Sequence, residues 1–226
     1  MDRVAVVTGA NRGIGREVTR QLAERGFHTI LTARDETKGR TAAQEIGVDF
    51  LQLDVSDDIS VERCARNVES EFGRVDVLVN NAAIHYDTWH RGVDADLTTV
   101  HEAFETNVLG AWRTSQGFIP LMGRNKWGRI VNVSSQAGSL ASMGAGTPAY
   151  SVSKAALNAF TRVLAAELKN GGILVNSVCP GWVATDMGGA GGRPVEAGAA
   201  SIMWAVLLDD DGPTGGFFRD GRSLSW

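Results

Sequence analysis

The sequence predicts an α/β protein in which one doubly wound parallel sheet carries helices on both faces. Short apolar runs rich in β-branched residues alternate along the chain with longer segments of helical pattern. The apolar runs are continuous rather than alternating, as expected for strands that are covered on both faces. The chain has 226 residues, 43% of them hydrophobic, which is enough for one complete core. We therefore expect a single domain of the Rossmann type.

The first strand is predicted over residues 4–8, where an unbroken apolar run passes into a glycine turn, and a helix over 13–25 follows. The same alternation predicts later strands at residues 29–32, 50–53, 75–79, 130–133 and 174–178, with a short last strand around 216–218. The later helices are predicted at residues 37–46, 57–72, 97–122, 149–169 and 194–208. Repeated strand, helix, strand order makes neighbouring strands parallel and places ligand sites at their carboxyl ends.

Composition excludes several classes of function. The formal charge of −4 argues against a nucleic-acid surface or a polybasic membrane patch, because both need clustered positive charge. Cys64 and Cys179 lie far apart in apolar stretches, so we expect no disulfide framework. The apolar run at residues 4–7 is too short for a signal peptide, and no run approaches the length of a membrane span. We expect a cytoplasmic protein.

Residues 8–15 read TGANRGIG and stand between the first strand and the first helix. Glycines there let the backbone turn tightly and approach a pyrophosphate, whose charge is met by the amides at the start of the helix. Ordinary turns also use glycine, but this position favours a dinucleotide site.

The end of the second strand indicates which dinucleotide binds. Arg34 stands where an acidic residue would accept a bond from the ribose hydroxyl, and an arginine there binds a 2′-phosphate instead. Arg12 in the glycine turn adds a second cation. Together they favour NADP, although Asp35 leaves room for NAD and both arginines could be ordinary surface residues.

Tyr150 and Lys154 stand four residues apart in a predicted helix, so their side chains share one face. An ammonium beside a phenol favours the ionised phenol and lowers its pKa. Such a pair is most often a solvated helix face. Its interpretation as a proton-transfer centre depends on the other motifs of the chain.

Five motifs occur in an order typical of one family. They are the glycine turn, residues 80–83 (NNAA), Asn107, residues 133–135 (VSS) and the Tyr150 to Lys154 pair, followed by a proline-glycine turn in residues 179–187 (CPGWVATDM). With them the chain resembles a classical short-chain dehydrogenase/reductase over nearly its whole length. Residues 32–35, 179–187 and 212–226 look most like NADPH-dependent carbonyl reductases. Only fourteen residues separate Ser135 from Tyr150, so the long insertion of the monomeric members is missing.

The resemblance implies a role for four residues, Asn107, Ser135, Tyr150 and Lys154. Tyr150 would give its proton to the carbonyl oxygen, and Lys154 would lower the tyrosine pKa and hold the nicotinamide ribose. Ser135 would hydrogen-bond the substrate oxygen, with Ser134 as the adjacent alternative. Asn107 would place a water that relays protons to Lys154. No metal is expected, because no His, Cys and carboxylate spacing indicates a zinc site.

The family pattern also implies the cofactor contacts. Asp54 would receive the adenine amino group, and the proline-glycine turn would embrace the nicotinamide. Ala83 stands where glycine is usual, a change we expect to be tolerated if its φ is not positive. The expected contacts are Gly9, Asn11, Arg12, Gly13, Ile14, Gly15, Arg34, Asp54, Val55, Asn80, Ala82, Tyr150, Lys154, Pro180, Gly181, Val183 and Thr185.

Loops at the ends of the fourth, fifth and sixth strands supply the expected substrate wall. Aromatic and methionine side chains there make an apolar, adaptable pocket, so we expect a ketone or aldehyde with an apolar body. The expected contacts are Ser135, Ala137, Tyr150, Trp182 and Met187, with Leu140, Met143, His85, Tyr86 and Trp89 as further candidates. His85 is not expected to be catalytic, and residues 188–192 are a candidate mobile flap.

These expectations favour an NADPH-dependent carbonyl reductase. The alternatives are an NAD(P)-dependent alcohol dehydrogenase acting oxidatively on a sterol, sugar or terpene alcohol, and a cofactor-binding sensor without turnover. The cofactor-binding part would span about residues 1–130 and the catalytic and substrate loops about 131–226. Apolar side chains on several faces of the helices near residues 112–122 and 155–168 predict a homodimer or homotetramer.

Overall fold

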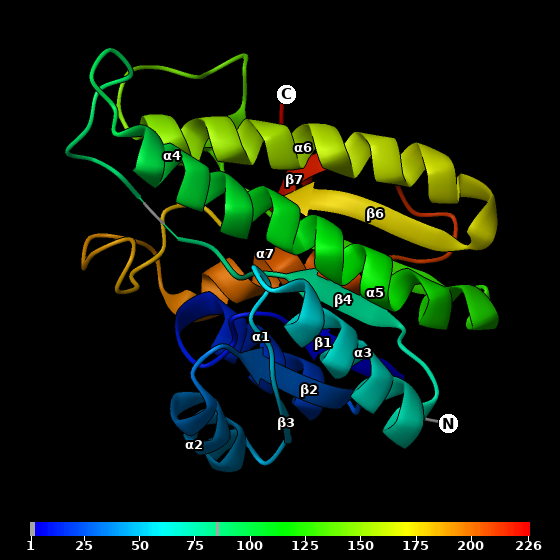
Figure 1. Ribbon diagram of the computed structural model, residues 1–226. Helices are drawn as coiled ribbons and strands as arrows, with labels where there is room; N and C mark the ends of the chain where they lie inside the picture. The colour runs from blue at the N-terminus through cyan, green and yellow to red at the C-terminus, as the bar shows by residue number, and fades with distance from the viewer. Residues whose placement is uncertain (1–2, 85) are drawn as a thin grey trace.

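A computed structural model describes residues 3–84 and 86–226 of the chain. Its described residues form one sheet in the order β3-β2-β1-β4-β5-β6-β7-β8, with helices on both sides (Figure 1). All neighbouring strands are parallel except the last pair, which is antiparallel. The strands are β1 (Val4–Val7), β2 (His28–Ala33), β3 (Asp49–Gln52), β4 (Val77–Asn80), β5 (Gly128–Val133), β6 (Ile173–Val178), β7 (Phe217–Arg219) and β8 (Arg222–Ser223).

The helices are divided between the two faces of the sheet by the alternation of side chains along each strand. In β1, Val4 and Val6 face one core cluster, whereas Ala5 and Val7 face the other. The first cluster is covered by α3, α5 and α6, and the second by α1, α2 and α7. The helices are α1 (Gly13–Glu24), α2 (Glu36–Ile46), α3 (Asp58–Phe72), α4 (Leu97–Phe104), α5 (Gly110–Asn125), α6 (Pro148–Leu168) and α7 (Val195–Val206).

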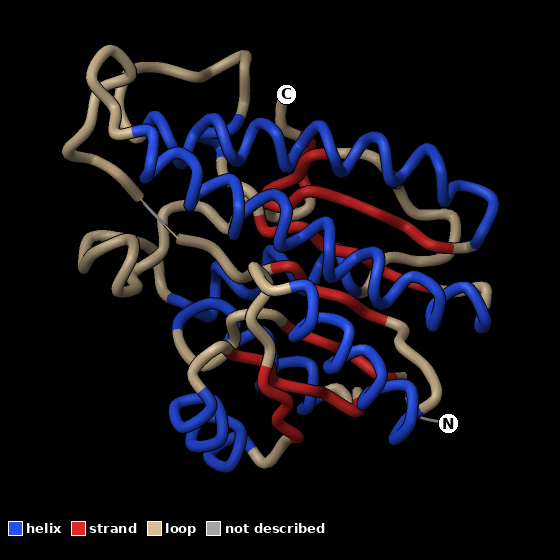
Figure 2. Tube along the Cα trace, viewed as in Figure 1, coloured by secondary structure: helices blue, strands red, loops and turns tan. Residues whose placement is uncertain are grey.

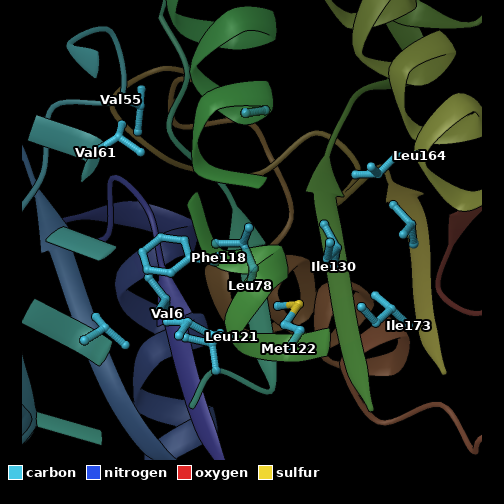
Figure 3. Packing of buried hydrophobic residues seen from close by; sticks show 14 of the residues in the cluster. Val6, Val55, Val61, Leu78, Phe118, Leu121, Met122, Ile130, Leu164 and Ile173 are labelled. Carbon is cyan, nitrogen blue, oxygen red and sulfur yellow. The ribbon is translucent and has the colours of Figure 1, made fainter. Parts of the chain in front are cut away.

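Packing between α5 and the centre of the sheet illustrates the first cluster. Figure 3 shows Phe118 and Met122 of α5 beside Leu78 of β4 and Ile130 of β5. Each of these four side chains is at most 1% exposed. Complete burial of a side chain of this size contributes roughly 1.5–3 kcal/mol, so this contact fixes the helix on the sheet.

The predicted doubly wound architecture is confirmed, and Figure 2 shows its strands lying between helices. Two details were not predicted. The helical stretch expected over residues 97–122 is present over residues 97–125, and it contains a π-helical turn, Glu105–Leu109, between α4 and α5. At the edges of the sheet, β3 is only partly buried and the short strand β8 is exposed.

A buried polar chain crosses the sheet below the carboxyl ends of its central strands. The amide of Asn80 donates to Asn132 at 2.8 Å, and Asn132 donates to Thr161 of α6 at 2.9 Å. Thr161 in turn shares a 2.8 Å bond with Ser177 of β6. Because its members bond one another, this chain fixes the relative position of β4, β5, β6 and α6. The residues that follow these strands therefore stand on a rigid base.

Candidate active site

Helix α6 brings Tyr150 and Lys154 together at the carboxyl end of β5. The ammonium of Lys154 lies 5.5 Å from the centre of the Tyr150 ring, as the four-residue spacing predicts. Lys154 is 2% exposed and donates to the carbonyl oxygen of Val133 at 2.8 Å. That bond uses one of three ammonium donors and fixes the side chain below the phenol.

Ser135 follows β5 and faces the same phenol. Its hydroxyl lies near enough to the phenol to lower the pKa of Tyr150, and it accepts from the amide of Ala137 at 3.2 Å. The adjacent Ser134 is 2% exposed, and its hydroxyl lies 3.5 Å from the carbonyl oxygen of Lys154. The geometry therefore places Ser135, rather than Ser134, beside the phenol.

Burial dominates the electrostatics of this pair. It raises the pKa of the Tyr150 phenol above its ordinary value, and the nearby Ser135 hydroxyl opposes this only in part. Burial also lowers the pKa of Lys154 to about 8. The spacing of Tyr150 and Lys154 predicted a lowering of the tyrosine pKa by the lysine. The net direction is upward instead, because desolvation of the phenolate outweighs the other effects.

Asn107 lies in the π-helical turn and is 1% exposed. Its side-chain amide accepts from the Ile84 amide at 2.9 Å, donates back to the Ile84 carbonyl at 3.1 Å, and donates to Ser153 at 3.0 Å. Ser153 donates to the carbonyl of Tyr150 at 2.8 Å. Asn107 therefore fastens the loop after β4 to α6, and its expected role in holding a water stays a prediction.

The glycine turn fits a diphosphate group. Gly9 and Gly13 have φ of +61° and +55°, in the left-handed region that favours glycine. A Cβ at Gly9 would lie 2.9 Å from the Cα of Ala82, and one at Gly15 would overlap the amide of Asn81. Helix α1 begins at Gly13, so its first amides point into the turn. Asn11 and Ile14 are partly buried beside these glycines.

Residues 81 and 82 hold the glycine turn in place. The hydroxyl of Thr8 accepts from the amides of Asn81 and Ala82, both at 3.0 Å, and the Asn81 side chain donates to the carbonyl of Thr8 at 2.9 Å. Among the described residues, the non-glycine residues with positive φ are Lys126, Thr147 and Asp220. Ala83 is not one of them, which meets the condition set for its replacement of glycine.

Arg34 is exposed at the end of β2, and in the described part of the chain no carboxylate pairs with its guanidinium. The neighbouring Asp35 caps α2, because its carboxylate accepts from the Lys38 amide at 3.0 Å. This bond lowers the pKa of Asp35. The Asp35 carboxylate, which was the reason to keep NAD as an alternative, is therefore engaged in capping α2.

The residues that are expected to contact the adenosine differ in how their side chains lie. One carboxylate oxygen of Asp54 accepts from the amide and hydroxyl of Ser56, and Val55 packs closely against Gly110. Asn80 is 4% exposed and turns its amide inward to the buried polar chain, so a cofactor contact from it would have to come from its backbone. Ala82 is half-buried against Gly9.

The loop after β6 reaches back to the glycine turn. The Thr185 side chain lies against Gly13, and Arg12 pairs with Asp186 at 2.8 Å. Gly181 follows the buried Pro180 in a tight turn and has φ of +80°. Val183, which is 4% exposed, forms a parallel β-bridge with Arg193, and this contact closes the loop on itself. Arg12 is thus held by this loop rather than standing free.

The expected substrate residues are only partly assembled. Tyr86 meets the Tyr150 ring edge to face at 5.2 Å. Trp182 is 63% exposed, and its indole nitrogen donates to the Gly188 carbonyl of its own loop at 2.7 Å. Ala137 and Met143 are half-buried, Met187, Trp89 and Leu140 are exposed, and His85 lies outside the described residues.

Asp87 is a site residue that sequence reasoning missed. It is 0% exposed, and its carboxylate accepts from the backbone amides of Ala149 at 3.0 Å and Tyr150 at 3.1 Å. Its partners are more than sixty residues away, so no local pattern signals the contact. Cys179 is a second case, because its sulfur accepts from the Gln136 amide at 3.3 Å.

Across residues 3–84 and 86–226, no group of three or more His, Cys, Asp or Glu side chains is arranged to hold a metal ion. Over the same residues, none of the helices combines the length and the apolarity that crossing a bilayer requires.

Comparison with known proteins gives a consistent result. A family model described as short chain dehydrogenase matches residues 3–193. The (+)-neomenthol dehydrogenase of Arabidopsis thaliana is 35% identical over 284 aligned positions, covering 96% of this chain and 95% of that protein. Salutaridine reductase of Papaver somniferum is 33% identical over 304 positions, with coverages of 99% and 96%. Both alignments are longer than this chain, so these relatives carry insertions that it lacks.

Among solved structures, the NADPH-bound carbonyl reductase from chicken fatty liver superposes with a TM-score of 0.91 at 26% identity. The match covers 100% of this chain and 94% of that one.

Proposed function

The chain belongs to the short-chain dehydrogenase family of oxidoreductases, and on this premise we propose that it transfers a hydride between NADPH and the carbonyl of an apolar ketone or aldehyde. One observation carries the proposal. The Tyr150 phenol lies beside the Ser135 hydroxyl and the buried ammonium of Lys154, at the carboxyl ends of the strands.

In this proposal a nicotinamide cofactor supplies the hydride when it is bound. The Tyr150 phenol donates its proton to the carbonyl oxygen of the substrate. The Ser135 hydroxyl donates a hydrogen bond to the same oxygen and stabilises the negative charge that develops there. The raised pKa of Tyr150 keeps the phenol protonated at neutral pH, which suits an acid working in the reductive direction. Lys154 holds the ribose with its remaining donors.

The glycine turn would hold the pyrophosphate, and Asp54 the adenine. The choice of NADP is supported by the free guanidinium of Arg34 and by the use of Asp35 as a helix cap. Lys38 lies 3.4 Å from Asp35 and adds a second cation at this edge. A 2′-phosphate would thus meet two positive charges, and the one nearby carboxylate is already engaged.

The proposal is tested by following NADPH consumption over a panel of cyclic and aromatic ketones and aldehydes. We expect turnover of several apolar carbonyls with NADPH and weaker turnover with NADH. Failure of every carbonyl in the presence of demonstrated NADPH binding would contradict the proposed reaction while leaving the cofactor assignment intact.

A second candidate is oxidation of an alcohol, since the A. thaliana relative is named as a dehydrogenase of neomenthol. Terpene, sterol and sugar alcohols offered with NADP⁺ or NAD⁺ would distinguish it, because an oxidative enzyme turns these over faster than it reduces the matching ketones. A sensor without turnover is the least favoured, because Ser135, Tyr150 and Lys154 lie together, and a protein that only binds the cofactor would be free to lose them.

We also propose that the protein is a cytoplasmic homodimer or homotetramer that associates through α5 and α6. Trp112 of α5 and Val152 and Val163 of α6 expose 41%, 48% and 52% of their surface, and Leu109, at the end of the π-helical turn before α5, exposes 40%. Trp112 stacks on Phe160 at 4.5 Å, which joins the two helices into one apolar face.

A further inference from the structure

The catalytic helix begins in a way that leaves its first turn without a cap of its own. Thr147, which precedes it, has φ of +45°, and its side chain makes no capping bond to the helix amides. Pro148 is the first helical residue and has no amide proton. The next amides belong to Ala149 and Tyr150, and a helix cannot satisfy these donors itself.

Asp87 satisfies both donors from a distant part of the chain. Its two carboxylate oxygens accept one amide each, from Ala149 at 3.0 Å and from Tyr150 at 3.1 Å. The carboxylate is 0% exposed, so water does not compete for these bonds. A negative charge is also favoured at this end of a helix, where the peptide dipoles leave a partial positive charge.

Tyr86, the residue before Asp87, contacts the side chain of Tyr150. The Tyr86 ring meets the Tyr150 ring at 5.2 Å with an angle of 87° between the planes. Such edge-to-face contacts stabilise a pair beyond the area they bury. Two consecutive loop residues therefore hold both the backbone amide and the ring of Tyr150.

This loop is itself anchored to the catalytic helix. Asn107 holds both backbone groups of Ile84 and also bonds Ser153, whose hydroxyl donates to the Tyr150 carbonyl. The amide, the ring and the carbonyl of Tyr150 are thus fixed through the same stretch of chain. A displacement at Asp87 would release the amide while leaving the other two contacts in place.

We propose that Asp87 is a positioning residue for Tyr150, whose carboxylate aligns the phenol with the reacting carbonyl by holding the first turn of α6. The inference rests on the proposed function, in which Tyr150 is the proton donor. Displacement of a reacting group by about 1 Å can cost on the order of 100-fold in rate. We expect a fall of that size in kcat for Asp87→Asn, because an amide offers one acceptor where two donors must be met.

The test uses the fact that the chain contains two tyrosines, Tyr86 and Tyr150. Protein labelled with 3-fluorotyrosine gives one fluorine resonance from each, and Tyr86→Phe assigns them while keeping an aromatic ring at position 86. In that background the remaining resonance reports the ring of Tyr150 alone. Asp87→Asn should shift and broaden it, because the first turn of α6 is no longer fixed.

Asp96→Asn is the matched control. Asp96 is an exposed cap in the same inter-element segment, where it accepts from the Thr98 amide at 2.9 Å and serves α4 instead. It should leave the Tyr150 resonance and kcat unchanged. In Asp87→Asn the dissociation constant of NADPH should stay within about 2-fold of the parent while kcat falls, since the glycine turn is untouched.

An unchanged Tyr150 resonance in Asp87→Asn, or a loss of kcat, NADPH affinity and thermal stability in parallel, would overturn the proposal. If Asp87→Asn does not fold, Asp87→Ser keeps a smaller acceptor and is judged by the same readouts. Inactivity of the parent enzyme on every substrate would count against the proposed function alone, because the fluorine spectrum reports the position of Tyr150 without turnover.

Discussion

Gly15→Ala probes the packing that holds the cofactor turn. A Cβ at Gly15 would overlap the Asn81 amide and lie 3.0 Å from the Cα of Ala10. Asn81 would have to move and lose its bonds to the carbonyls of Thr8, at 2.9 Å, and Gly9, at 3.1 Å. Two lost hydrogen bonds cost about 1 kcal/mol each and overpacking about 1–3 kcal/mol, against a gain of about 1 kcal/mol in helix propensity.

The expected net loss is about 2 to 4 kcal/mol of unfolding free energy, or roughly 5 to 15 °C in Tm for a chain of this size. Thermal unfolding followed by circular dichroism measures it, and NADPH titration should show weaker binding because the turn is displaced. Gly123→Ala is the control, since Gly123 lies in α5 with nothing within 4 Å of an added Cβ. Equal Tm values for the two variants would refute the packing argument.

Three further predictions concern specificity, pH and assembly. Arg34→Asp should raise the KM for NADPH by about 10-fold or more and lower that for NADH, because a phosphate contact becomes a repulsion; unchanged cofactor preference would count against Arg34. Since the pKa of Lys154 is lowered to about 8, its ammonium is lost above that pH, so kcat/KM for reduction should fall as pH rises through about 8. If kcat/KM for reduction does not change with pH in this range, the charge of Lys154 does not contribute to the reaction. Trp112→Glu should convert the oligomer to monomer in sedimentation velocity, and a parent that sediments as a monomer would end the dimer proposal.

The strand and helix order could be predicted because each central strand is a short run dominated by apolar, β-branched residues. Residues 128–133 and 173–178 are buried throughout, and their patterns carry that information locally. The π-helical turn at Glu105–Leu109 gives no such local signal, because the bonds of Asn107 to Ile84 and Ser153 exist only after the loop and α6 have packed.

Two parts of the candidate site could be predicted from the sequence, because the motif in each part determines its local geometry. The spacing of Tyr150 and Lys154 fixes their common face, and the glycine turn requires positive φ. Burial was not predictable from spacing, and it reverses the expected direction of the tyrosine pKa. The hydrogen bond of Trp182 to Gly188 within its own loop was also not predictable from the sequence, and its contact with substrate stays a prediction.

The central claim is that Tyr150 donates the proton in a hydride-transfer reaction. Its most direct test compares the parent enzyme with Tyr150→Phe, measuring kcat for NADPH-dependent reduction of the best carbonyl and the dissociation constant of NADPH by fluorescence. We predict unchanged NADPH binding and a fall in kcat of about 10²- to 10⁴-fold, the range expected for loss of a general acid. Retention of most of the turnover in Tyr150→Phe would contradict the account.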